Sequence, residues 1–280
     1  MKYPKTPAIE ATFMRAEVYA PGQFIAGVDY LGMPKLNGIR AMWVPKVGFF
    51  SSDGIAYATG VLPHLEAELA DCKTFLDGEF YIHGRALQKI NSMASIMREK
   101  PHPQVEELQF HAFDIPYTTK DAETRMNDIA MLTAAMSHVI PVKWQWIKCY
   151  RSADVFFDAQ LAMNYEGAMY KHSGAYRMGR SRLLLKRKGW LDEDFDVVDM
   201  IEGEISGKYN GTLGALICRT ADGSTFKVGS FVFDDADRLE LWAAWQAGQR
   251  KARAKVKFLG YTETKIPYHT QCLGVTIVGR

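Results

Sequence analysis

The chain has 280 residues, of which 48% are hydrophobic, and its 34 Lys and Arg against 32 Asp and Glu give a formal net charge of +2. This length supports either one large domain or two domains of unequal size, each with a buried core. A nearly neutral chain has no strong electrostatic field of one sign, so any nucleic acid must be bound through local patches of charge.

The four cysteines are scattered, with no C-x-x-C pair and no histidine at zinc-ligand spacing. This arrangement argues against a structural zinc site and a disulfide framework and predicts reduced thiols. The beginning of the chain lacks the apolar stretch of a secretory signal, and no apolar run approaches the roughly 18 residues of a membrane span. We therefore expect a cytoplasmic, monomeric protein with no membrane partner.

The first two thirds of the chain mixes strand-like and helix-like patterns. Runs rich in β-branched and aromatic residues, separated by Gly, Pro and Asp, predict strands near 24–31, 39–50 and 72–84. Apolar residues at helical spacing predict helices over 61–70 and 121–138. The mixture indicates an α+β domain over residues 1–189.

The pattern changes after Trp190. An acidic stretch, LDEDFD, is followed by strand-like runs between Gly-rich turns and by one helical pattern, DDADRLELWAAWQAG. Five strands and one helix predict a small closed β-barrel of the OB type over residues 190–280. A hinge is expected near 189–193.

The segment PKLNGIR contains Lys35 and Arg40 on either side of a glycine turn. Two cations and a close backbone approach could hold a phosphate group. Lys35 taken alone is more simply interpreted as a solvated lysine, because an amine is rarely desolvated enough to act as a nucleophile.

Two further segments place like charges on one strand face. In FLDGEF, Asp77 and Glu79 are two residues apart and could meet a cation or a ribose hydroxyl, although a hairpin turn with solvated acids fits equally well. In LLLKRK, Lys186 and Lys188 alternate onto one face, which is unfavourable unless an anion lies between them. The alternative is a solvated edge strand whose charges discourage aggregation.

Aromatic residues in FHAFDIPY could stack on a nucleotide base. For Phe110 a core position is the better interpretation, whereas spacing leaves Phe113 undecided. Asp114 interrupts this otherwise buried-looking strand. Further along, NYEGAMYK places Glu166 before a glycine and an apolar strand.

Taken in order, these segments resemble the motifs of the covalent nucleotidyltransferase superfamily, which contains ATP-dependent DNA ligases, RNA ligases and mRNA capping enzymes. KLNGIR is similar to the lysine motif K-x-D-G-x-R, and DGEF, FHAFDI, EGAMYK and LLLKRK are similar to the motifs that follow it. GKYNGTLGALICRTADGSTFKVGSFVFDDADR resembles the OB domain of small viral and bacterial DNA ligases. The resemblance covers nearly the whole chain and implies a minimal DNA ligase.

The resemblance implies a role for each matching residue. Lys35 would attack the α-phosphate of ATP and carry AMP, Arg40 and Glu79 would contact the ribose, and Phe113 would stack on adenine. Glu166 and Asp77 would serve Mg²⁺ or Mn²⁺, while Lys186 and Lys188 would neutralise the α-phosphate. The implied partner is nicked duplex DNA, in repair, replication or recombination.

Four features depart from the family pattern. Asn37 stands where the family usually has Asp, and an amide cannot accept a proton. Ser52 occupies the place of an arginine that binds the 5′-phosphate of the nick. Cys272 and Arg280 lie in the region of the last motif, where basic residues are expected. Finally, Lys35 lies so near the start that no DNA-encircling or nicotinamide-binding domain is expected before it, which favours ATP over NAD.

Two other classes of protein fit part of this pattern. An RNA ligase or a capping-type nucleotidyltransferase would share the lysine chemistry but use another acceptor or nucleotide. A non-catalytic OB-type protein that binds nucleic acid would form no AMP adduct at all.

Overall fold

A computed structural model of the protein describes residues 9, 12–20, 22–24, 27–262 and 264–277. The chain divides into two compact units, residues 1–188 and 189–280. No helix in these ranges is long and apolar enough to cross a membrane. The four cysteines are free thiols, and Cys149 is exposed whereas the other three are buried.

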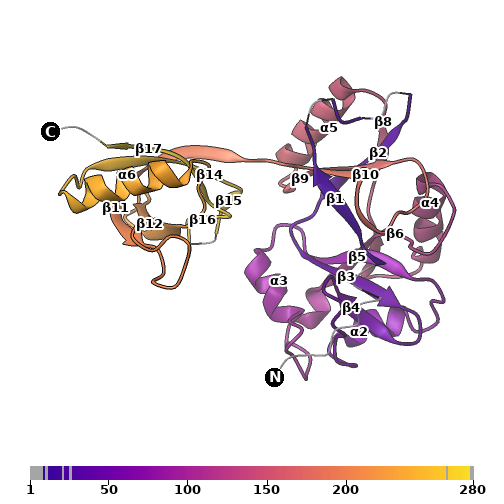
Figure 1. The fold of residues 1–280 in the computed structure, drawn as a ribbon. Coiled ribbons are helices and arrows are strands. Elements are labelled where there is room, and N and C mark those ends of the chain that lie inside the picture. The colour runs from indigo at the N-terminus through magenta and orange to yellow at the C-terminus, as the bar shows by residue number, and fades with distance from the viewer. Residues whose placement is uncertain (1–8, 10–11, 21, 25–26, 263, 278–280) are drawn as a thin grey trace. The chain divides into compact units, whose positions relative to one another are not determined.

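The first unit contains two five-stranded sheets (Figure 1). One has the order β1-β10-β9-β2-β8, and its strands are β1 (Met14–Val18), β2 (Tyr30–Lys35), β8 (Gln145–Ile147), β9 (Gly167–His172) and β10 (Gly179–Lys188). The other has the order β4-β3-β5-β6-β7, and its strands are β3 (Ile39–Val44), β4 (Gly48–Ser51), β5 (Leu76–Tyr81), β6 (Gln109–Asp114) and β7 (Val139–Pro141).

Helices accompany both sheets of this unit. α5 (Tyr150–Ala162) packs against β9 and β2, and α4 (Ala122–Leu132) packs against β6 and β7. The shorter helices are α2 (Pro63–Glu68), α3 (Leu87–Met93) and the 3₁₀ helix η1 (Val105–Glu107). α4 begins where its sequence predicts, because the side chain of Asp121 accepts a hydrogen bond from the Thr124 amide at 2.7 Å.

The apolar residues of β2, β3, β5 and β6 form the main core of this unit. It includes Met33, Trp43, Phe80 and Phe110, all of which are buried. The core interpretation of Phe110 is therefore confirmed. The first expected strand, near 24–31, begins later than predicted, because β2 starts at Tyr30.

The second unit has a five-stranded sheet of order β13-β12-β11-β14-β17 (Figure 1). Its strands are β11 (Leu191–Glu202), β12 (Leu213–Arg219), β13 (Thr225–Val228), β14 (Ala252–Phe258) and β17 (Gln271–Ile277), with the two-residue strands β15 (Gly260–Tyr261) and β16 (Pro267–Tyr268) beside them. The helix α6 (Asp235–Gln246) is capped by Asp234, whose side chain accepts from the amides of Ala236 and Asp237.

The α+β fold class is confirmed, but two details of the second unit differ from expectation. Among the residues described in this unit, the sheet is not closed into a barrel by a continuous ladder, because β17 meets the segment after β13 through an isolated bridge between Phe231 and Cys272. The acidic stretch at 191–196 belongs to β11, where exposed acids alternate with buried residues from Phe195 onward.

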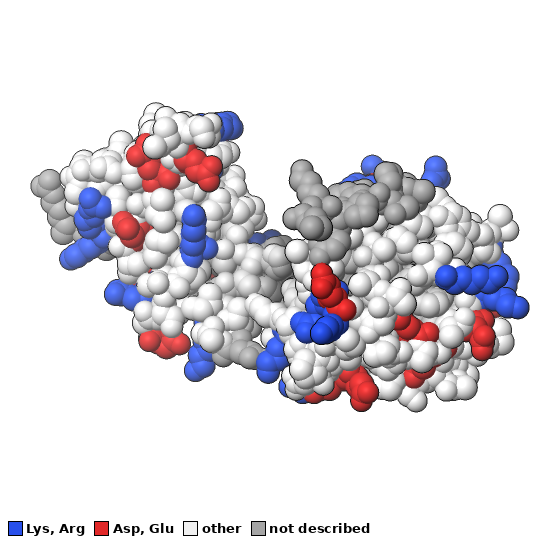
Figure 2. Space-filling model, turned by 90° about the horizontal axis from the view of Figure 1, so that it is seen from below, with Lys and Arg blue, Asp and Glu red and all other residues white. Residues whose placement is uncertain are grey.

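Charges are mixed on the surface drawn in Figure 2. Lys and Arg side chains alternate with Asp and Glu side chains on this face, and neither sign forms a continuous area. This distribution agrees with the small net charge of the chain.

Candidate active site

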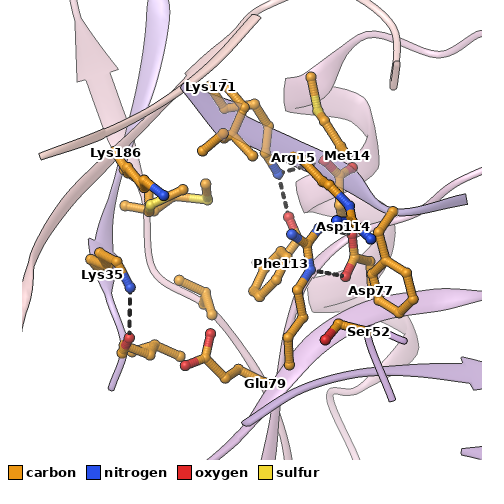
Figure 3. A pocket seen from close by; sticks show the side chains of 18 of the residues that line it. Met14, Arg15, Lys35, Ser52, Asp77, Glu79, Phe113, Asp114, Lys171 and Lys186 are labelled. Carbon is orange, nitrogen blue, oxygen red and sulfur yellow. Dashed lines mark hydrogen bonds and ion pairs between the residues drawn. The ribbon is translucent and has the colours of Figure 1, made fainter. Parts of the chain in front are cut away.

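A cavity of about 420 Å³ lies within the first unit, lined by both of its sheets. It is lined by residues from β2, β9 and β10 of one sheet and from β3, β5 and β6 of the other. Lys35 and Lys186 face Phe113 and Asp77 across it (Figure 3). Seven of the site residues expected from the sequence line this cavity: Lys35, Arg40, Asp77, Glu79, Phe113, Lys186 and Lys188.

Strand pairing places Lys35, the candidate nucleophile, and Lys188 on either side of the same residue of β9. Lys35 at the end of β2 and Lys188 at the end of β10 both have Gly167 of β9 as their Cα partner. A Cβ on Gly167 would lie 2.0 Å from the Arg187 carbonyl oxygen, and its φ of +152° is one that side chains rarely adopt. Glycine is therefore required where these three strands meet.

Glu166 bridges the two lysines. Its Oε2 lies 2.6 Å from Lys35 Nζ and its Oε1 lies 2.8 Å from Lys188 Nζ, with only 6% of the side chain exposed. Burial tends to raise the pKa of Glu166, but the two ammonium groups together lower it below its usual value. Glu166 is not among the residues that line the cavity, but it touches two that are.

Lys186 lies on the same face of β10 as Lys188, as the alternation predicts. β10 is paired on both sides, with β1 and β9, so it is not the solvated edge strand of the alternative interpretation. Among the residues that the structure describes, no carboxylate lies within ion-pair distance of Lys186 Nζ. Burial lowers the pKa of Lys186, and the nearby charges of Lys188, Lys35 and Arg180 lower it further.

Arg40 is held by Asp77 in a bidentate pair. Its Nε donates to Asp77 Oδ1 at 3.0 Å and its Nη2 donates to Oδ2 at 2.6 Å. The Tyr176 hydroxyl also donates to Oδ2, at 2.8 Å. The guanidinium lies about equally far from two aromatic rings, 5.1 Å from the Phe13 centroid and 5.4 Å from the Phe113 centroid.

These contacts bear on the metal role expected for Asp77. The side chain is fully buried, and both of its oxygens already accept hydrogen bonds. Within the described ranges, no group of three or more His, Cys, Asp or Glu residues could hold a metal ion. In this arrangement Asp77 orients Arg40 rather than presenting a free carboxylate.

Glu79 lies beside the turn that connects β2 to β3. Its Oε1 accepts a hydrogen bond from the Gly38 amide at 2.6 Å. A Cβ on Gly38 would lie 2.1 Å from the Phe80 carbonyl oxygen, so this turn can approach β5 only with glycine. Burial raises the pKa of Glu79 to about 7, although Lys35 and the Gly38 amide oppose the shift.

Asp114, Arg125 and Lys171 form a buried ion triad next to Phe113. Asp114 Oδ1 accepts from Arg125 Nε at 2.6 Å, and its Oδ2 lies 2.8 Å from Lys171 Nζ, which also donates to the Phe113 carbonyl. Burial tends to raise the pKa of Asp114, but Lys171 and Arg125 lower it. The triad connects β6 of one sheet to β9 of the other.

Sequence reasoning missed this triad. Asp114 stood out as an acid inside an apolar strand, and Lys171 is the last residue of the EGAMYK segment. Neither signal identified the other as its partner, because the two residues are far apart in the chain. Tyr176 and Phe13 were missed too, since neither belongs to a charged motif.

The residues that depart from the family pattern lie in different parts of the chain. Ser52 lines the cavity just beyond β4. Cys272 is buried on β17, where its Sγ donates to the Gly274 carbonyl oxygen at 3.4 Å. Arg280 lies outside the described residues.

A match to a family model and matches to solved structures both support the fold. Residues 204–275 match the family described as DNA ligase OB-like domain. A solved structure of a Lig E DNA ligase, from work on DNA binding with a minimal scaffold, shares 24% identity, covers 94% of this chain and 98% of its own, and superposes with a TM-score of 0.77. A comparison with curated protein sequences finds no match.

Two viral enzymes have the same fold at lower similarity. The Chlorella virus DNA ligase-adenylate has 20% identity and a TM-score of 0.53, with 95% of this chain and 98% of that chain covered. The ATP-dependent DNA ligase of bacteriophage T7, in complex with ATP, has 12% identity and a TM-score of 0.53, with 95% and 99% covered. At these identities the likeness establishes the fold of the chain.

Proposed function

We propose that this chain, which has the fold of the ATP-dependent DNA ligases, is itself an ATP-dependent DNA ligase that seals nicks in duplex DNA. The observation that carries the proposal is the position of Lys35. Its side chain lies at the wall of a cavity and is 18% exposed, and its ammonium shares one buried carboxylate with Lys188. A solvated surface lysine would have none of these features.

In the first step, Lys35 loses a proton and its amine attacks the α-phosphorus of ATP. A phosphoramide bond forms, the bond to the β-phosphate oxygen breaks, and pyrophosphate leaves. Lys186 and Lys188 stabilise the charge that develops on the α-phosphate. Arg40 and Glu79 bind the ribose, and Phe113 stacks on adenine.

In the second step, a 5′-phosphate oxygen of the nick attacks the phosphorus of the bound AMP. The phosphorus–nitrogen bond breaks, and the Lys35 amine takes up a proton. In the third step, the 3′-hydroxyl attacks the 5′-phosphate of the DNA-adenylate, which forms the phosphodiester and releases AMP and the hydroxyl proton. Lys35 therefore ends the cycle as it began.

Glu166 is the carboxylate that would serve Mg²⁺ or Mn²⁺, and to do so one of its oxygens would have to exchange its lysine partner, Lys35 or Lys188, for the ion. Mg²⁺ in such sites is held by one or two carboxylates together with substrate phosphates, so a dedicated cage of protein ligands is not required. When bound, the metal ion would withdraw charge from the phosphate oxygens. Asp77 would contribute by holding Arg40.

The direct test is the intact mass of the protein with and without ATP. A gain of one AMP, lost on addition of nicked DNA with a 5′-phosphate, is expected. Parallel incubations with GTP and with nicked RNA separate the rival enzymes, because labelling by GTP alone would indicate a capping-type enzyme and sealing of RNA alone an RNA ligase. A purely nucleic-acid-binding protein would gain no mass with either nucleotide.

A further inference from the structure

The Asp77 carboxylate accepts a hydrogen bond from Tyr176 in addition to the two from Arg40. Its Oδ2 accepts from Arg40 Nη2 at 2.6 Å and from the Tyr176 hydroxyl at 2.8 Å, whereas its Oδ1 accepts from Arg40 Nε at 3.0 Å. The terminal torsion of an aspartate side chain has a broad energy minimum, so the orientation of the carboxylate is set by its hydrogen-bond partners. Tyr176 therefore restricts the rotation of the group that holds Arg40.

The direction of the Tyr176 hydroxyl is fixed by a backbone amide. The Met14 amide nitrogen of β1 lies 2.7 Å from the hydroxyl oxygen. An amide N–H can only donate and an ionised carboxylate can only accept, so the hydroxyl accepts from Met14 and donates to Asp77. A hydrogen bond from a hydroxyl to a carboxylate is charge-assisted and therefore stronger than one between neutral groups.

The ring of Tyr176 has contacts that do not depend on its hydroxyl. The guanidinium of Arg125 lies 6.0 Å from the ring centroid, and Arg125 also donates to the carbonyl of Gly174, two residues earlier, at 2.9 Å. Burial raises the pKa of Tyr176 and the charge of Asp77 raises it further, so the hydroxyl keeps its proton at neutral pH. Removal of the hydroxyl alone should leave the ring in place.

The start of β1 supports Arg40 by a second contact. Phe13 precedes Met14, and its ring centroid lies 5.1 Å from the guanidinium carbon of Arg40. Phe13 and Met14 are both buried, and Met14 pairs with Gly179 of β10, three residues after Tyr176. Arg40 belongs to β3 of the other sheet. Its guanidinium is therefore held by Asp77 from its own sheet and supported from the opposite sheet through Phe13 and Tyr176.

We propose that Tyr176 is a positioning residue for nucleotide binding, which orients Arg40 towards the ribose by holding the Asp77 carboxylate. Tyr176 does not line the cavity and acts through two side chains that do. The inference rests on the proposed ligase function, which supplies the nucleotide and the contact between Arg40 and the ribose. A guanidinium that is ordered before binding loses less entropy on binding, so Tyr176 should act on the KM for ATP rather than on the rate at saturation.

The test compares Tyr176→Phe with Tyr170→Phe as the matched control. The Tyr170 hydroxyl also donates a hydrogen bond, to the Ala153 carbonyl at 2.8 Å, and Tyr170 does not line the cavity. Tyr176→Phe should raise the KM for ATP in lysyl-AMP formation about fivefold and leave the rate at saturating ATP unchanged. The control should change neither quantity. Urea unfolding measures the stability of both variants, and a smaller folded fraction by itself does not change a KM.

Nucleotide analogues distinguish positioning of Arg40 from a general loosening of the cavity. The KM is measured for ATP, 2′-deoxyATP and 3′-deoxyATP in the unsubstituted protein and in Tyr176→Phe. If Tyr176 acts through Arg40, the substitution should have little effect on the analogue that lacks the hydroxyl contacted by Arg40. For the same reason, Tyr176→Phe should have no further effect in an Arg40→Gln background.

The inference is overturned if Tyr176→Phe keeps the KM of the unsubstituted protein or raises it by the same factor for all three nucleotides. A full additional effect in the Arg40→Gln background, or an equal rise of the KM in Tyr170→Phe, would also overturn it. Failure of the proposed function would look different, because the unsubstituted protein itself would then form no lysyl-AMP, and the inference would fall with the function.

Discussion

Asp77 holds the guanidinium of Arg40 by two parallel hydrogen bonds, of 3.0 and 2.6 Å, at the wall of the cavity. Both the arginine and the acid lie on paired strands, β3 and β5, so the geometry is fixed by the sheet as well as by the ion pair. Paired bonds of this kind give direction as well as strength. The ribose is therefore expected to meet an arginine whose orientation is already set.

Asp77→Asn should raise the KM for ATP about tenfold, because the amide nitrogen cannot accept a hydrogen bond and one of the two bonds from Arg40 is lost. If the acid acts only through Arg40, the double variant with Arg40→Gln should be no worse than Arg40→Gln alone. The Mg²⁺ concentration for half-maximal adenylation should not change. A shift of that midpoint in Asp77→Asn would instead support Asp77 as a metal ligand.

Lys35→Ala should abolish the covalent AMP adduct and leave the unfolding temperature nearly unchanged, since the side chain lies at a cavity wall rather than in the core. Intact mass spectrometry with ATP measures the adduct. Lys73→Ala, at an exposed loop lysine, is the control and should adenylate normally. An adduct that persists in Lys35→Ala would place the nucleophile on another residue.

Lys188→Ala should slow lysyl-AMP formation about a hundredfold, because a preorganised charge near the reacting phosphate is lost. Its effect on affinity for nicked duplex should be much smaller. Single-turnover adenylation and fluorescence anisotropy measure the two quantities in the same preparation. Equal losses in both would indicate that Lys188 is mainly a DNA contact.

Glu79 should make the protein less stable as the pH rises. Its pKa is about 7 in the folded protein, against an ordinary value of 4.5. Between these values the folded state holds a proton that the unfolded chain has released, so the free energy of unfolding falls with pH, by up to about 3 kcal/mol. Glu79→Gln removes this dependence. The free energy of unfolding of E79Q relative to the parent, measured by urea unfolding, should therefore increase from about pH 5 to pH 8. Parallel curves of unfolding free energy against pH for the two proteins would contradict a raised pKa of Glu79.

Asp114→Asn should destabilise the first unit by about 3–5 kcal/mol, because Arg125 and Lys171 would remain buried without an opposite charge. Arg125→Met should cost less, since Lys171 and Asp114 would remain paired. Urea unfolding of both variants measures the order. A larger loss in Arg125→Met would mean that the hydrogen bonds from Arg125 to the Lys120 and Gly174 carbonyls dominate.

Much of the site could be predicted because its residues lie in short motifs on strands. Alternation along β5 and β10 was enough to place Asp77 with Glu79 and Lys186 with Lys188 on common faces. The partners of these residues could not be predicted in the same way. Glu166 meets Lys35 only because β9 lies between β2 and β10, and strand order is not encoded in local periodicity.

In the fold, too, the features set by neighbouring residues could be predicted, whereas those set by residues far apart in the chain could not. Helix α6 follows from its acidic cap and its apolar spacing, both of which are local. The edges of the second sheet depend on how β13 and β17 approach each other, which the strand pattern does not specify. The barrel was therefore expected to be closed where the structure shows a single bridge.

The distribution of the cysteines has a practical consequence. Cys149, at the start of α5, is the exposed thiol of the four, and hydrogen bonds with Ser152 lower its pKa, whereas burial raises the pKa of Cys72, Cys218 and Cys272. The thiolate is the form that reacts with maleimides. The unsubstituted protein therefore carries a natural attachment point for one dye or tether at a residue that does not line the cavity, and a single-molecule test of the proposed nick sealing needs no engineered cysteine.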